Sequence, residues 1–150
     1  MEKQTFNTVI DASPEQVWKV LFGEKTYTEW TSVFADGSTA QTDWNEGSRA
    51  VFLDGNNQGM VAKIAKNIPN KFLSIQHLGI IKDGKEDLES DEVKKWAGCH
   101  ENYTLNTING KTELIIDMEV TEDYKDYFLK VWPLALNKVK DIAEHQLVNR

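Results

Sequence analysis

The sequence predicts an α+β domain in which a curved antiparallel sheet of about seven strands surrounds one long C-terminal helix. Apolar residues recur at helical spacing near the end of the chain, and between 33 and 120 they alternate with polar residues. Two short helical segments follow the first strand. With 150 residues, the chain is expected to form a single domain, residues 1–150, that buries about 70% of its unfolded surface.

The C-terminal segment is predicted to form a helix from 122 to 147. Its apolar residues recur every three or four positions and therefore share one face. These residues are Tyr124, Phe128, Val131, Trp132, Ala135, Val139 and Ile142. Pro133 lies nearly opposite this face and removes one backbone hydrogen bond, so we expect a kink that bends the helix toward the sheet.

Near the proline this helix is apolar over more than one face, because Leu129, Leu134 and Leu136 flank the main stripe. A helix that is so broadly apolar is expected to be covered on more than one side. The sheet can cover one side. The segment 27–34 or, in a homodimer, a second subunit can cover another.

The first thirty residues are predicted to form one strand and two short helices. Residues 3–10 alternate between apolar and polar side chains, as a strand does. Ser13 supplies a capping side chain, Pro14 suits the first helical position and Gln16 completes a capping box, so a helix is predicted over 13–22. A second short helix is predicted over 24–30.

Six further strands are predicted in the middle of the chain. They lie at 37–43, 48–54, 59–67, 71–79, 98–107 and 112–120, and turn residues separate them. Asn109-Gly110 is the strongest hairpin signal, since both residues tolerate the positive φ angles of a two-residue type I′ turn. In the last strand apolar residues alternate with acidic ones, which predicts an antiparallel sheet with one buried and one solvated face.

An acidic segment interrupts the predicted strands. Residues 82–92 hold six acidic residues and two lysines. We interpret this segment as a solvated loop. The alternative is that it gates an opening into the interior.

The charge of the chain excludes several partners. The formal net charge is −7, which argues against nucleic acid and against anionic membrane surfaces, because both attract basic proteins. No window approaches the roughly 18 apolar residues of a membrane span, so no membrane insertion is expected. The N-terminus lacks a secretion signal, and the lone Cys99 fits a reducing compartment. A cytoplasmic location is therefore expected.

Several stretches resemble one known superfamily. Residues 10–18 (IDASPEQVW) resemble the opening of the START-like, or Bet v 1-like (SRPBCC), superfamily, and residues 27–30 (YTEW) resemble its short second helix. Trp132-Pro133 and the apolar residues that follow, with residues 110–114 (GKTEL) in the last hairpin, resemble the branch named after the activator of Hsp90 ATPase. The resemblance spans nearly the whole chain and implies the helix-grip fold with an apolar cavity between sheet and helix.

The resemblance suggests three functions. The leading hypothesis is a binder or carrier of a small hydrophobic molecule. The first alternative is a cyclase- or hydrolase-type enzyme, which requires at least two titratable side chains that converge inside the cavity. The second is an Hsp90-type chaperone co-factor, which requires an exposed apolar patch larger than a few hundred Å². We favour the binder, because the sequence offers polar anchors and no evident catalytic pair.

If a ligand binds, we expect it to contact a set of aromatic and apolar side chains around one histidine. The set is Trp30, Phe34, Phe52, His77, Tyr103, Trp132 and Leu136. His77 shares the face of Leu73 and Ile75, and that face is expected to be the inner one. The alternatives are that the aromatic residues form plain core and that His77 is hydrogen-bonded at the core edge.

No catalytic residue, cofactor or metal site is assigned from the sequence. There is no Gly-rich phosphate loop and no paired-cysteine pattern, and Cys99-His100 can supply at most two of the three or four ligands that zinc requires. Arg49, Glu101 and Asp117 are expected to lie on the solvated face of the sheet.

Overall fold

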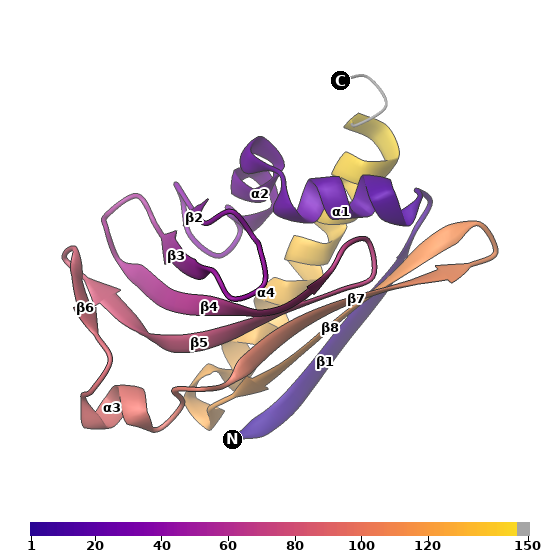
Figure 1. Cartoon of the computed structure of the whole chain (residues 1–150). Helices are drawn as coiled ribbons and strands as arrows, with labels where there is room; N and C mark the ends of the chain where they lie inside the picture. The colour runs from indigo at the N-terminus through magenta and orange to yellow at the C-terminus, as the bar shows by residue number, and fades with distance from the viewer. Residues whose placement is uncertain (147–150) are drawn as a thin grey trace.

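The computed structural model describes residues 1–146 of the chain, and its secondary structure follows the predicted order (Figure 1). The elements are β1 (Glu2–Ile10), α1 (Pro14–Phe22), α2 (Glu24–Thr31), β2 (Thr39–Gln41), β3 (Arg49–Leu53), β4 (Gly59–Ile68), β5 (Phe72–Lys82), β6 (Lys85–Asp87), α3 (Asp91–Lys94), β7 (His100–Ile108), β8 (Lys111–Val120) and α4 (Glu122–Asp141). A π-helical turn over Ile142–Gln146 continues α4. The predicted last helical residue, 147, lies outside the described residues.

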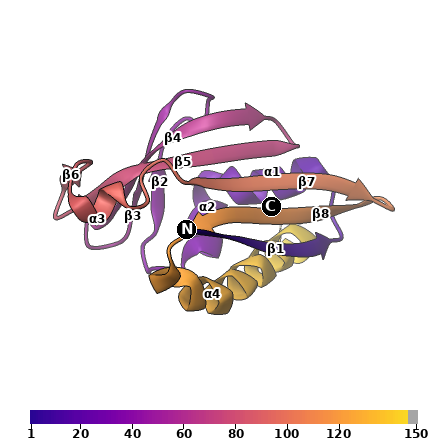
Figure 2. The ribbon, with the colours of Figure 1, turned by 90° about the horizontal axis from the view of Figure 1, so that it is seen from below.

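The strands form one antiparallel sheet in the order β1-β8-β7-β5-β4-β3-β2, with β6 paired to the end of β5. The sheet curves, and α4 runs across its concave side with α1 and α2 near the C-terminal end of the helix (Figure 1). Seen from below, α4 lies alongside β1 (Figure 2). This arrangement confirms the predicted α+β helix-grip fold.

Local sequence signals explain where the first elements begin and end. The Ser13 hydroxyl accepts a hydrogen bond from the Gln16 backbone N–H, and the Gln16 side chain accepts one from the Ser13 N–H. This capping box, with Pro14 in the first turn, starts α1. At the same end of the sheet Asn109 and Gly110 have φ angles of 49° and 80° and join β7 to β8, as the sequence predicted.

The buried face of α4 matches the predicted one except at its first residue, Tyr124, which is 55% exposed. Val131, Trp132, Ala135, Leu136 and Val139 are buried, and Pro133 lies on the exposed side. The bend expected at the proline stays a prediction.

The second cover expected over α4 is present only in part within the described chain. Phe34, which follows α2, packs on Trp132 with ring centroids 5.0 Å apart, and its carbonyl accepts a hydrogen bond of 3.2 Å from the Tyr127 hydroxyl. Leu129 and Leu134 are each 51% exposed. The homodimer that would cover the leucines stays a prediction.

The acidic segment 82–92 is not the loop that the sequence predicted. Strand β5 continues to Lys82, and a two-residue turn at Asp83-Gly84, with φ angles of 52° and 79°, leads into β6. Glu86 of this strand forms an ion pair with Arg49. The sheet therefore has eight strands rather than about seven. The Asp83-Gly84 pair between the charged residues is itself a hairpin signal.

Candidate ligand cavity

A cavity of about 520 Å³ lies between the concave face of the sheet, α2 and α4. Its volume falls within the range of small-molecule sites. Six of the seven residues predicted to contact a ligand line it, and these are Trp30, Phe34, Phe52, His77, Tyr103 and Trp132. Leu136 does not, because it lies one turn further along α4, buried in the core. That these side chains bind a ligand stays a prediction.

The aromatic side chains of the cavity form a connected wall. Trp132 of α4 contacts Trp30, Phe34 and Tyr103, with ring centroids 6.0, 5.0 and 6.3 Å away. Tyr27 of α2 contacts Phe52 of β3 at 6.1 Å. Aromatic contacts of this kind add about 0.5–1.5 kcal/mol each beyond the area they bury, so they stabilise this part of the wall.

The polar group of the cavity is a cluster of three side chains on β5 and β7. His77 Nε2 lies 3.1 Å from one carboxylate oxygen of Glu101, and the Tyr103 hydroxyl donates a short hydrogen bond to the other oxygen. An ionised carboxylate only accepts hydrogen bonds, so Nε2 must carry a proton. The side chains of His77 and Glu101 are 11% and 16% exposed, so the pair is largely shielded from bulk water.

The sequence prediction that Glu101 lies on the solvated face is wrong, because its side chain lines the cavity. Strand β7 alternates, and Glu101 points to the same side as the buried Tyr103 two positions later. This alternation was the signal that could have found it, because Tyr103 was already a cavity candidate. The carboxylate is tolerated there because His77 and Tyr103 donate to both oxygens.

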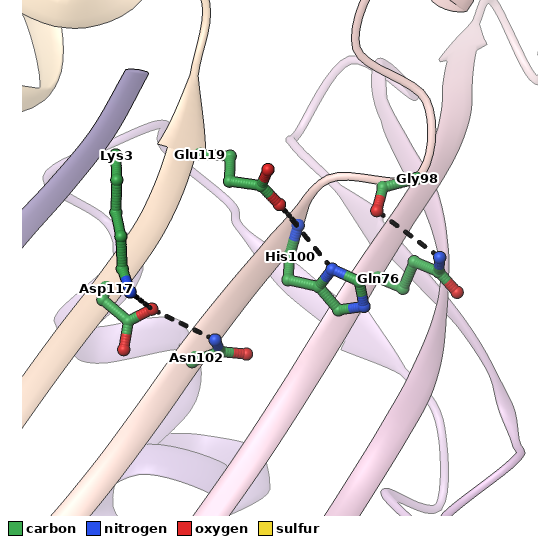
Figure 3. Close-up of polar contacts among 7 residues, drawn as sticks. All are labelled: Lys3, Gln76, Gly98, His100, Asn102, Asp117 and Glu119. Atoms are coloured by element: carbon green, nitrogen blue, oxygen red, sulfur yellow. Dashed lines mark hydrogen bonds and ion pairs between the residues drawn. The ribbon is translucent and has the colours of Figure 1, made fainter. Parts of the chain in front are cut away.

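The other two strand charges lie on the outer face, as predicted. Asp117 of β8 lies 3.6 Å from the Lys3 ammonium nitrogen and accepts a hydrogen bond of 3.1 Å from Asn102, as Figure 3 shows. Arg49 is more than half exposed and pairs with Glu86. These groups are separated from the cavity by the sheet.

Backbone irregularities hold His77 in position. The pairing of β4 and β5 shifts register next to His77, where Leu78 is an extra residue that bulges the strand. The His77 N–H donates to the Cys99 carbonyl at 2.9 Å, and its own carbonyl accepts from the Gly98 N–H at 2.8 Å. Gly98 has a φ angle of 93°, which a glycine adopts without strain. His77 itself lies opposite Cys99, and Glu101, which pairs with Ile75, is its diagonal neighbour on β7.

The carboxylate of Glu101 affects the pKa of two tyrosines. Burial raises the pKa of the Tyr103 hydroxyl well above its usual value, and the charge of Glu101 adds to this shift. Burial and Glu101 raise the pKa of Tyr27 in the same way. Both hydroxyls therefore stay protonated and can act as hydrogen-bond donors at any ordinary pH.

A second hollow of about 300 Å³ adjoins the first and is bordered by residues of α3. Six side chains border both hollows, and these are Met60, His77, Glu101, Met118, Tyr124 and Phe128. The His77–Glu101 pair thus lies on the shared wall. Of the segment 82–92, only Glu92 borders this second hollow and none borders the first, so a gating role for that segment stays a prediction.

Within residues 1–146, no group of three or more His, Cys, Asp or Glu side chains is arranged to hold a metal ion. None of the helices in the same range is long and apolar enough to cross a membrane. The sequence placed Cys99 among inert residues. Burial, followed by the charges of Glu119 and Glu101, raises the pKa of its thiol from 9.0 to about 11.

Cys99 is therefore expected to react slowly with iodoacetamide in the folded protein. The thiolate is the reactive form, and a pKa raised by two units lowers the thiolate fraction near pH 8 about a hundredfold. Alkylation should accelerate as the pH rises through 11, and it should reach the rate of a free thiol when urea unfolds the chain. Mass spectrometry of timed samples measures this. Equal rates in native and unfolded protein at pH 8 would contradict the prediction.

Together the curved sheet, the helix it grips and the aromatic cavity between them define a helix-grip domain with a partly open cavity. The family described as Activator of Hsp90 ATPase homolog 1-like protein matches residues 11–144. The match covers most of the sequence, and the chain belongs to this family. Comparison with curated proteins gives no significant match.

Solved structures share the fold at low sequence identity. The Aha1 dimer from Colwellia psychrerythraea is 22% identical, with a TM-score of 0.71, and the match covers 97% of this chain and 98% of that chain. ChR145 from Cytophaga hutchinsonii is 20% identical, with a TM-score of 0.70 and coverage of 99% and 97%. DynU16, from the dynemicin biosynthetic locus, is 12% identical, with a TM-score of 0.73 and coverage of 97% and 48%. Such likenesses show the fold alone.

Proposed function

We propose that the protein binds a small hydrophobic molecule in the cavity between the sheet and α4. The observation that carries this proposal is the cavity of about 520 Å³ with an aromatic wall and one polar cluster. Apolar walls supply affinity by burying ligand surface, and a few fixed polar groups orient the ligand. The resemblance to the START-like superfamily suggested the same role, and the family match agrees with that resemblance.

A second candidate function is acid–base catalysis on the bound molecule. The sequence offered no catalytic pair, whereas the structure brings His77, Glu101 and Tyr103 together within hydrogen-bonding distance. Converging titratable groups inside the cavity are what an enzyme of this kind requires, so this cluster supports the second candidate. Glu101 orients the imidazole, as a carboxylate does in many acid–base sites.

Two further hypotheses concern the outer surface of α4. Leu129 and Leu134 are each half exposed there, and exposed apolar side chains on one helix suit a protein partner. A second copy of the chain is favoured as this partner by the dimeric relative from Colwellia psychrerythraea. The chaperone co-factor role stays a prediction, since the family name does not establish an activity for this chain.

Filling the cavity is expected to prevent binding. In Met60→Trp a larger side chain would occupy space that borders both hollows, so the affinity for the neutral probe N-phenyl-1-naphthylamine should fall at least about tenfold. The probe's own fluorescence measures binding. Ile68→Trp adds the same bulk to the exposed end of β4 and should leave the affinity unchanged. A wild-type protein that binds no probe, or two variants that bind equally, would refute the proposal.

Native mass spectrometry of freshly purified protein then separates binding from catalysis. If a copurified small molecule keeps the same mass after it is incubated with the protein, the protein is supported as a carrier. A bound molecule whose mass changes, and which stays unchanged in a His77→Ala variant, supports the enzyme.

A further inference from the structure

We propose that the cavity selects apolar ligands that carry an ammonium group over carboxylates with the same apolar chain. This inference rests on the proposed function and adds the chemical class of the ligand. It comes from the sign of the charge that the chain places around the two hollows.

The charged and titratable groups around the hollows are acidic, apart from one histidine, Cys99 and several tyrosines. They are Asp54, His77, Glu92, Glu101 and Glu119. No lysine or arginine among residues 1–146 borders either hollow. A fatty acid or a phosphate ester would therefore find no fixed cation for its head group, although such anions are commonly held by arginine or lysine.

Glu101 decides the sign of the charge inside the cavity. Its side chain is only 16% exposed, whereas Glu119 is 47% exposed and pairs with His100 on the outer side. The partner of Glu101 is His77. With neutral His77 the pair carries one negative charge, and with protonated His77 it carries none. In neither state is the pair positive, so a bound carboxylate gains nothing from it and is repelled when His77 is neutral.

The surroundings of Glu101 also suit a cation. Phe52, whose ring centroid lies 6.3 Å from the His77 ring, and Tyr27 and Tyr103 present aromatic rings to the same cavity. Aromatic faces attract ammonium groups, and the attraction grows when water is excluded. Each oxygen of Glu101 accepts one hydrogen bond from the protein, and a carboxylate oxygen can accept a second. An ammonium N–H can therefore complete the site.

Three ligands with the same dodecyl chain test the proposal, and they are dodecylamine, dodecanol and dodecanoate. Binding is measured at pH 8 as the displacement of N-phenyl-1-naphthylamine from the wild-type protein, with each ligand kept below its own critical micelle concentration. We expect the amine to bind at least about tenfold more tightly than the carboxylate, because like charges across a buried site are strongly disfavoured. The alcohol should lie between them. Dodecanoate or dodecanol binding as tightly as the amine would overturn the proposal.

Two matched substitutions assign the preference to Glu101. Glu101→Gln removes the buried charge and should reduce the ratio of amine to carboxylate affinity to about threefold or less. Asp117→Asn removes an equal charge from the outer face (Figure 3) and should leave the ratio unchanged. An unchanged ratio in Glu101→Gln, or an equal change in both variants, would overturn the assignment.

Circular dichroism checks that each variant folds. If Glu101→Gln does not fold, the wild-type ligand series still decides the proposal. If the wild-type protein binds none of the three ligands and no probe, the proposed function fails as well. A protein that binds the probe but favours dodecanoate leaves the proposed function intact and overturns only the charge selection.

Discussion

Trp132→Ala is expected to lower the free energy of unfolding by about 3 kcal/mol, near the lower end of the range for large-to-small substitutions of buried aromatic residues. The indole is 2% exposed and packs against Phe6, Trp30, Phe34 and Tyr103. Alanine would leave a void between α4 and the sheet. The buried indole N–H has no hydrogen-bond partner among the described residues, so its removal recovers part of the loss.

Urea unfolding measures this change, and the same helix offers a matched control. Leu134→Ala truncates a side chain that is half exposed and replaces one good helix former with another. Its effect should stay within about 0.5 kcal/mol. Equal effects of the two substitutions would show that the indole is not the contact between helix and sheet that the structure describes.

Removal of residues 121–150 is expected to abolish cooperative folding. The deleted segment contributes a buried face that includes Val131, Trp132, Leu136 and Val139. Each large buried apolar side chain stabilises the fold by about 1.5–3 kcal/mol, so their joint loss is comparable with the whole stability of a domain, about 5–15 kcal/mol. Residues 1–120 should show no sharp thermal transition by circular dichroism.

A synthetic peptide of residues 121–150 provides the control for this truncation. Added in excess, it should restore a cooperative transition, because the gripping sheet then regains its helix. A cooperative melt of residues 1–120 alone would show that the sheet is stable without α4, and would contradict the central role assigned to the helix.

Most of the fold could be predicted from the periodicity of apolar residues in the sequence. The strands of the sheet and the face of α4 could be predicted because each buries one side, and burial leaves a period of two or of about 3.6 in the sequence. Strand β6 was missed because its three residues, Lys85–Asp87, are all charged and show no alternation. The breadth of the apolar surface on α4 was predicted. Segment 27–34 covers part of that surface, while Leu129 and Leu134 are half exposed.

The cavity walls were easier to predict than the polar cluster inside them. Aromatic side chains indicate an interior wherever they occur on the inner face, so six of the seven candidates were found. Glu101 was assigned to solvent because an isolated carboxylate is costly to bury. The sequence does not show that His77 lies next to it, since the pairing of β5 with β7, two strands far apart in the chain, decides that contact.

The aromatic wall also gives the protein an intrinsic spectroscopic signal. The indoles of Trp30 and Trp132 lie 6.0 Å apart at an interplanar angle of 37°, close enough for their excited states to couple. Such coupling gives a near-ultraviolet circular dichroism band that exists only while the rings hold a fixed geometry. A molecule entering the cavity would alter this band without any added label, so occupancy and tertiary order can be followed separately from the far-ultraviolet signal of the backbone.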